Sequence, residues 1–191
     1  MATEDTAASH AGLAASEWIA RWSHLLAPGA AVLDVAYGQG RHMQWFAGRG
    51  HAVTGVDRST EATEAASAFG RTVTADIESG PWPFAGRVFG AVVVTNYLWR
   101  PRLADIVAAV APGGVLLYET FAAGNETVGK PSRPDFLLQP GELLAACREL
   151  RVVAYENGFL AEPERFVQRI AAVRAGNAAS GQPERHLLRG N

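Results

Sequence analysis

Short apolar runs alternate with segments of helical periodicity along most of the chain. The apolar, β-branched runs predict seven strands, at residues 31–36, 52–57, 72–76, 88–95, 115–120, 151–156 and 165–174. Elsewhere apolar residues recur at spacings of three and four, which predicts helices at 13–26, 41–48, from 59 or 60 onward, around 103–110 and at 140–150. Strands that alternate with helices are typical of a parallel sheet covered by helices on both faces.

The order of these elements predicts an α/β fold, a Rossmann-like three-layer sandwich in a single domain. Its seven-stranded sheet should be mostly parallel, with an antiparallel C-terminal strand, because the last two strands follow one another without a helix. Right-handed crossovers would place a ligand at the carboxyl ends of the strands, where the strand order reverses. We expect residues 1–10 and 176–191 to be flexible tails, since they are mostly small and polar.

Composition and charge narrow the class of protein. The 191 residues are 48% hydrophobic and carry a formal net charge of −2, which fits one folded domain and gives no basic surface for nucleic acid. No apolar run approaches the roughly 20 residues of a membrane helix, and the N-terminus lacks the features of a secretion signal. The single cysteine, Cys147, excludes an internal disulfide. We therefore expect a cytoplasmic monomer or homodimer that binds neither nucleic acid nor membranes.

The strongest chemical signal follows the first predicted strand. Asp34, Ala36, Gly38 and Gly40 lead from this strand through a glycine turn into a helix that begins at Arg41. Glycine tolerates unusual backbone angles and lets a ligand approach the main chain closely. The start of the helix also offers unpaired N–H groups to an anion.

Two further acids end the next two strands. A carboxylate at Asp57, after the second strand, can accept hydrogen bonds from both hydroxyls of a ribose. A carboxylate at Asp76, after the third strand, can accept one from an adenine amino group. Arg58 and Ile77 directly follow these acids and belong to the same predicted cofactor site. Acids after three successive strands are more specific than the glycine turn alone.

This arrangement resembles the class I S-adenosylmethionine-dependent methyltransferases over about residues 31–120. The family's first motif has an acid, small residues and Gly-x-Gly, and Ala36 stands where glycine is common. The resemblance implies that Asp57 binds the ribose, that Asp76 and Ile77 bind the adenine, and that the cofactor is S-adenosyl-L-methionine, with S-adenosyl-L-homocysteine as product. The Gly-Arg-His run and the small size resemble the tellurite-resistance and thiopurine methyltransferase-like branch more narrowly.

The implied reaction is in-line methyl transfer to a small-molecule acceptor. Asn96 and Tyr97 follow the fourth strand, where the family lines its reaction pocket, and we expect Asn96 to contact the cofactor too. Glu119, at the end of the fifth strand, either orients or deprotonates the substrate or is a structural ion-pair partner. Arg41 is either a clamp on the methionine carboxylate, a solvated side chain or a partner of Asp34. Asp34 either holds the turn or contacts the amino group of the ligand.

Two other functions remain open on the sequence. One is a non-catalytic S-adenosylmethionine-binding regulator, and the other is an NAD-type oxidoreductase. The dinucleotide fingerprint requires glycine or alanine where this chain has Met43, which disfavours the second. No metal site is predicted, because no helix carries two histidines at ligand spacing. The long polar loop at 122–134 is either a lid or a solvated connection, and His42 is either a core-edge or a pocket residue.

Overall fold

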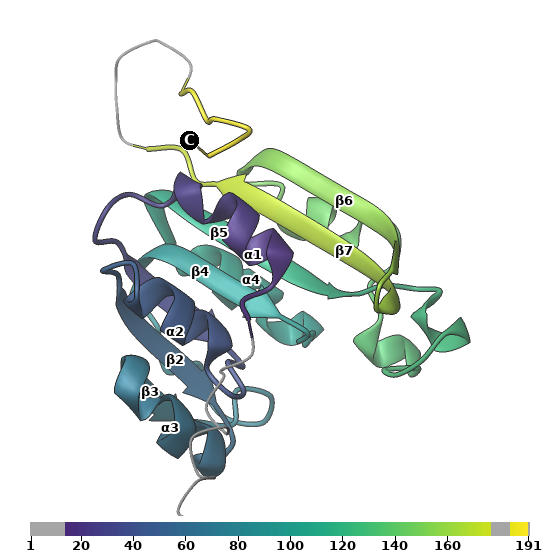
Figure 1. The fold of residues 1–191 in the computed structure, drawn as a ribbon, viewed down its shortest axis with the longest axis horizontal. Coiled ribbons are helices and arrows are strands. Elements are labelled where there is room, and N and C mark those ends of the chain that lie inside the picture. The colour runs from purple at the N-terminus through teal and green to yellow at the C-terminus, as the bar shows by residue number, and fades with distance from the viewer. Residues whose placement is uncertain (1–13, 177–183, 191) are drawn as a thin grey trace, which may run out of the picture.

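In the computed structural model, a seven-stranded sheet organises the described residues, which are 14–176 and 184–190 (Figure 1). The strand order is β3-β2-β1-β4-β5-β7-β6. The strands are β1 (Ala31–Val35), β2 (Ala52–Asp57), β3 (Arg71–Thr74), β4 (Phe89–Thr95), β5 (Val110–Phe121), β6 (Arg151–Ala161) and β7 (Glu164–Val173). The first five strands pair in parallel, and β7 is antiparallel to both β5 and β6. The predicted mostly parallel sheet is confirmed.

Helices cover both faces of this sheet. One face carries α1 (Glu17–Trp22), α2 (Arg41–Ala47) and α3 (Thr60–Ala66), and the other carries α4 (Leu103–Ala108) and α5 (Glu142–Ala146). Alternate strand residues face opposite layers, so Ala91 and Val93 pack toward α1 and α2 while Val92 and Val94 pack toward α4. None of the helices in the described residues is long and apolar enough to cross a membrane. The predicted three-layer sandwich is therefore confirmed.

Helix α1 lies across β5 and β7 and is held by aromatic packing (Figure 1). Trp18 and Trp22 are buried, with their rings 5.6 Å apart, and the Trp18 indole N–H donates to the carbonyl oxygen of Ile170 on β7. The helix is shorter than the predicted 13–26, because it continues only as a 3₁₀ turn from Ser23–Leu25. Residue 13 and the predicted tail at 1–10 lie outside the described residues, as do residues 177–183 and 191 of the predicted tail at 176–191.

The C-terminal hairpin is longer than the sequence pattern predicts. Strand β6 continues to Ala161 rather than to residue 156, and β7 already begins at Glu164. The extension is stabilised by the Phe159 and Phe166 rings, which are paired across the two strands with their centroids 5.0 Å apart. Asn157 and Gly158 interrupt the apolar alternation, which hid these last residues of β6. The hairpin therefore projects past the end of β5.

The connections at the carboxyl ends of the strands differ in how they are held. Residues 75–88, between β3 and β4, contain no helix, and the Trp82 and Phe84 rings pack edge-to-face instead. The loop after β5 is anchored by the buried side chain of Asn125, which donates to the carbonyl of Pro131 and accepts from the N–H of Phe166.

The same loop is anchored a second time by Arg100, which lies in the connection after β4. Its guanidinium donates to the carbonyls of Asp135 and Leu137 and forms an ion pair with Glu142 at 2.7 Å. The loop is thus held at Asn125 and at residues 135–137, whereas most side chains of residues 126–134 are exposed. Whether it is a lid or a solvated connection stays a prediction.

Candidate active site

The turn after β1 is built on three residues with positive φ, which are Ala36 (53°), Gly38 (56°) and Gly40 (75°). Gly40 must also be glycine for packing, because a Cβ there would lie 2.7 Å from the Cβ of Ala66 on α3. A Cβ on Gly38 would meet no atom within 4 Å, so the turn faces open space at this point. Ala36 adopts a conformation that costs a non-glycine residue about 1 kcal/mol or more.

Asp57 extends from the end of β2 and is held by two backbone groups. Its Oδ2 accepts a hydrogen bond from the Gly38 N–H at 3.0 Å, and its Oδ1 accepts one from the Ser59 N–H at 2.9 Å. The carboxylate is thereby fixed between the glycine turn and the start of α3. Each oxygen keeps a free lone pair, so the group can accept two further hydrogen bonds.

Asp76 follows β3 and is held by its own loop. Its Oδ1 accepts from the N–H groups of Glu78 and Ser79, and its Oδ2 accepts from the Ser79 hydroxyl at 2.6 Å. The Ser79 hydroxyl and these backbone donors lower the pKa of Asp76, so it is a carboxylate at neutral pH. The side chain can accept a hydrogen bond from a ligand.

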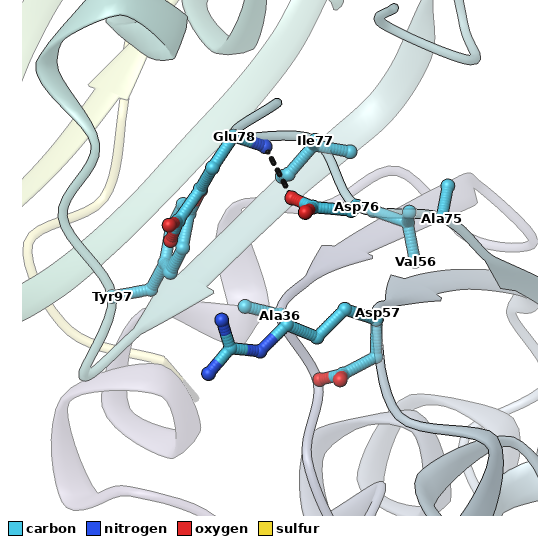
Figure 2. A pocket seen from close by; sticks show the side chains of 9 residues that line it. Ala36, Val56, Asp57, Ala75, Asp76, Ile77, Glu78 and Tyr97 are labelled. Carbon is cyan, nitrogen blue, oxygen red and sulfur yellow. Dashed lines mark hydrogen bonds between the residues drawn. The ribbon is translucent and has the colours of Figure 1, made fainter. Parts of the chain in front are cut away.

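A cavity of about 150 Å³ connects these two acids (Figure 2). It is lined by Ala36, Val56, Asp57, Arg58, Ala75, Asp76, Ile77, Glu78 and Tyr97. Figure 2 shows Tyr97 and Glu78 together on one side of the cavity and Asp57 on the opposite side. Six of the predicted site residues meet here, namely Ala36, Asp57, Arg58, Asp76, Ile77 and Tyr97. The sequence reading missed Val56, Ala75 and Glu78, although each adjoins a predicted residue in the chain.

Tyr97 therefore lies beside this cavity. Its hydroxyl is buried and has no hydrogen-bond partner, and burial together with the negative charges of Glu78 and Asp76 raises its pKa. A protonated phenol that faces a cavity is a hydrogen-bond donor for a ligand.

Asp34 and Arg41 lie next to the cavity but are not among the residues that line it. Asp34 is fully buried on the α2 side of β1, and burial raises its pKa to about 8, against the opposing effect of the Arg41 charge. The carboxyl group is therefore largely protonated at neutral pH. Arg41 occupies the first turn of α2 and is half-buried.

His42 is buried and connects two elements. Its Nε2 accepts from the N–H of Ser16 at 3.1 Å, so the proton of the neutral ring is on Nδ1, which lies 3.4 Å from the Thr95 hydroxyl. Burial and the neighbouring Arg41 lower its pKa to about 3. His42 is thus a neutral core-edge residue that joins the start of α1 to the end of β4.

Glu119 lies on the α1 face of β5 and is held by an ion pair and one hydrogen bond. Its Oε2 is 2.8 Å from Nε of Arg169 on β7, and its Oε1 accepts from the Ser16 hydroxyl at 3.0 Å. Only 1% of the side chain is exposed, and it does not line the cavity. Arg169 in turn contacts Glu17 and Glu156. Glu119 thus has the contacts of an ion-pair partner, and its other expected role, on the substrate, stays a prediction.

Asn96 ends β4 beside Glu119. It adopts a positive φ of 53°, its N–H donates to the Glu119 carbonyl at 2.9 Å, and its side chain is exposed. A left-handed asparagine at a strand end is one of the less costly forms of backbone strain. Within the described residues, no group of three or more His, Cys, Asp or Glu side chains could hold a metal ion.

Comparison with known proteins identifies the domain. Residues 32–114 match the family model described as a methyltransferase domain. TehB from Haemophilus influenzae is 20% identical with a TM-score of 0.62, and the match covers 76% of this chain and 57% of TehB. A methyltransferase from Methanosarcina mazei is 14% identical with a TM-score of 0.64, covering 86% of this chain and all of its own.

A TehB-like methyltransferase from Corynebacterium glutamicum is 21% identical with a TM-score of 0.56, covering 80% of this chain and 84% of its own. At these identities the solved structures establish the fold alone. No curated protein sequence matches the chain significantly. Residues 32–114 are therefore part of a methyltransferase domain, and the strand order is that of the class I fold, a family whose cosubstrate is S-adenosyl-L-methionine.

Proposed function

We propose that the protein methylates a small-molecule acceptor at the carboxyl ends of β1, β4 and β5. The observation that carries this proposal is the convergence of Asp57 and Asp76 on one cavity. The two carboxylates come from neighbouring strands, and each is held by local hydrogen bonds that leave lone pairs free.

The residues in the cavity fit an adenosyl group. The two free lone pairs of Asp57 suit the two hydroxyls of a ribose, and Asp76 suits an adenine amino group. Ile77 and Val56 supply apolar walls, and Arg58 lies at the exposed rim. A buried phenol without a partner, on Tyr97, supports ligand binding on the opposite wall.

The methionine end of the cosubstrate fits the turn between Gly38 and Arg41. The open space beside Gly38 admits a ligand close to the backbone, and the Arg41 guanidinium can bind its carboxylate. Asp34, buried below this turn, holds a proton near the same place. Asn96 extends from the adjacent strand toward the solvent side, where it can contact both cosubstrate and acceptor.

When bound, S-adenosyl-L-methionine supplies a methyl group that its sulfonium already activates. The contribution of this chain is therefore positioning and the exclusion of water. Asp57 and Asp76 fix one end of the cosubstrate, and the turn fixes the other. A small acceptor is favoured because, beyond the sheet and its helices, the described residues provide only the hairpin and the loop after β5 to surround it.

Calorimetric titration with S-adenosyl-L-homocysteine and with NAD tests the proposal on the unmodified protein. We expect saturable binding of S-adenosyl-L-homocysteine and none of NAD, since the buried Met43 fills the space that the dinucleotide fingerprint keeps open. Binding of NAD in preference would establish the oxidoreductase alternative. Binding of S-adenosyl-L-homocysteine without methyl transfer to any acceptor would establish the regulator.

A further inference from the structure

Arg165 lies at the acceptor edge of the sheet and has no part in the functions described so far. Because β7 is antiparallel to β5, its first residues stand at the same edge as the last residues of β4 and β5. The hairpin carries Arg165 past the end of β5, where it pairs with Leu160. Arg165 and Arg169 are four residues apart on one strand, so both side chains extend on the α1 face, beside Glu119.

The guanidinium of Arg165 has unused hydrogen-bonding capacity. Its side chain is only 21% exposed, and its Nη2 is 3.7 Å from Oε1 of Glu119, which is longer than a hydrogen bond. Its Nε is buried and has no hydrogen-bond partner. Glu119 is already bound to Arg169 and Ser16. Since nearly all buried polar groups are hydrogen-bonded in native structures, an unmet N–H at this edge indicates a ligand.

This arginine is close to the place where the acceptor must stand. Glu119 is in register with Thr95, the last residue of β4, and its carbonyl accepts from Asn96. Neighbouring strands are about 5 Å apart, so the Arg165 guanidinium beside the Glu119 carboxylate is about one strand spacing from the end of β4. Arg165 and Asn96 therefore lie at the same edge of the sheet.

The same edge offers no free general base among the residues that the structure describes on the α1 face. Glu119 is paired with Arg169, and Glu17 and Glu156 form ion pairs with the same arginine. The Nε2 of His42 is occupied by the N–H of Ser16. Asp34 is fully buried. An ammonium or an alcohol would have to lose a proton before or during methyl transfer. A carboxylate is already ionised at neutral pH and needs no base.

We propose that the acceptor is a small organic carboxylate, bound by Arg165 and methylated on its own oxygen. The planar guanidinium matches a carboxylate, and its Nη donors can hold one oxygen while the other faces the methyl group. The acceptor oxygen forms a bond to the methyl carbon as the carbon–sulfur bond breaks, and the electron pair of that bond passes to sulfur. The products are a methyl ester and S-adenosyl-L-homocysteine, and no proton is transferred. This inference rests on the proposed methyltransferase function.

Nuclear magnetic resonance of the arginine Nε–H groups tests the inference in the complex with S-adenosyl-L-homocysteine. The Arg165 signal is assigned by its loss in Arg165→Lys, and the protein is titrated with sodium acetate and, separately, with acetamide. Sodium chloride keeps the ionic strength constant. Arg133 is the internal control, because its side chain is 71% exposed and pairs with Asp135 rather than with Glu119.

We expect acetate to shift the Arg165 signal saturably, acetamide to leave it unchanged, and the Arg133 signal to follow neither ligand. The carboxylate assignment is overturned if the shift of the Arg165 signal does not saturate with acetate, or if acetamide produces an equal shift. Failure of S-adenosyl-L-homocysteine to bind at the outset would instead contradict the proposed function. The two failures are therefore distinguishable.

Discussion

Acidic residues end strands on both halves of the sheet, but the two halves use them differently. On the β2 and β3 side, Asp57 and Asp76 are held mainly by backbone N–H groups and keep lone pairs that face a cavity. On the β5 and β7 side, Glu119 is buried and bound to Ser16 and Arg169. A carboxylate at a strand end is thus a ligand-binding group only where the fold leaves part of it unbound.

The difference has an electrostatic consequence for the reaction. The cavity side presents exposed negative charge to the hydroxyl and amino groups of an adenosyl moiety. The β7 side encloses its negative charge in ion pairs and leaves one guanidinium with free donors, that of Arg165. The first half suits a hydrogen-bond donor, and the second suits an anion.

Removal of Arg169 should have the largest effect, because it leaves Glu119 buried beside a weaker partner. We expect Arg169→Met to lower the free energy of unfolding by about 3–5 kcal/mol in urea titrations. Arg133→Met, which breaks an exposed pair with Asp135, is the matched control and should cost less than about 1 kcal/mol. Equal losses in both variants would show that the Glu119 pair is not buried as described.

Removal of Asp57 should abolish most cosubstrate affinity. Two hydrogen bonds to a charged group contribute about 3 kcal/mol at the lower end of their range, so Asp57→Ala should weaken S-adenosyl-L-homocysteine binding about 100-fold. Calorimetry measures the loss of affinity. Asp135→Ala is a control of equal charge change, because Asp135 pairs with Arg133 and does not line the cavity. A retained affinity in Asp57→Ala would remove Asp57 from the site.

The pH dependence of stability should show the raised pKa of Asp34, which neither lines the cavity nor takes part in the ion pairs around Glu119. Its pKa is about 8 in the folded state and 3.8 in the unfolded state. Between these two pH values the folded state keeps a proton that the unfolded state has lost, so stability falls as the pH rises toward 8. His42 acts in the opposite direction only below its unfolded pKa of 6.5. Between pH 6.5 and 8 the net slope should therefore be roughly 0.5–1 kcal/mol per pH unit, because Asp34 in the folded state and His42 in the unfolded state are each partly titrated there.

Asp34→Asn tests this assignment, because asparagine has no proton to lose. Urea titrations at several pH values should give a free energy of unfolding that declines from pH 6.5 to 8 in the unmodified protein and stays level in the variant. A decline of the same size in both would mean that another group is responsible.

Removal of the charge on Asp76 should have the smallest of these effects. Asp76→Asn should weaken S-adenosyl-L-homocysteine binding about fivefold, which corresponds to one hydrogen bond of about 1 kcal/mol. The loss should vanish when S-inosyl-L-homocysteine replaces the ligand, because inosine lacks the adenine amino group. A loss that persists with the inosine analogue would place the adenine elsewhere.

The sequence was most informative where a residue's partners are close to it in the chain or follow from the strand–helix repeat. Asp76 is held by residues two and three positions later, and Asp57 by the residue two positions later together with the glycine turn. Such contacts follow from strand–turn–helix geometry, which the alternation of apolar runs and glycine already indicates. The mostly parallel sheet and the cavity side of the site could therefore be predicted.

The β7 side could not be predicted in the same way. Ser16 is 103 residues from Glu119, and Arg169 meets it only because β7 returns antiparallel in one particular register. The apolar pattern also breaks at Asn157, which concealed how far the hairpin carries Arg165 beyond β5. Partners joined through a long-range register have no signature in a single sequence.

The affinity of Glu119→Gln for S-adenosyl-L-homocysteine, measured by calorimetry beside its free energy of unfolding, tests the contrast between the two halves most directly. We predict that the dissociation constant stays within about twofold of the unmodified protein while the free energy of unfolding falls, because Arg169 loses its buried counter-charge. A dissociation constant that rises as far as in Asp57→Ala, with stability unchanged, would contradict the account.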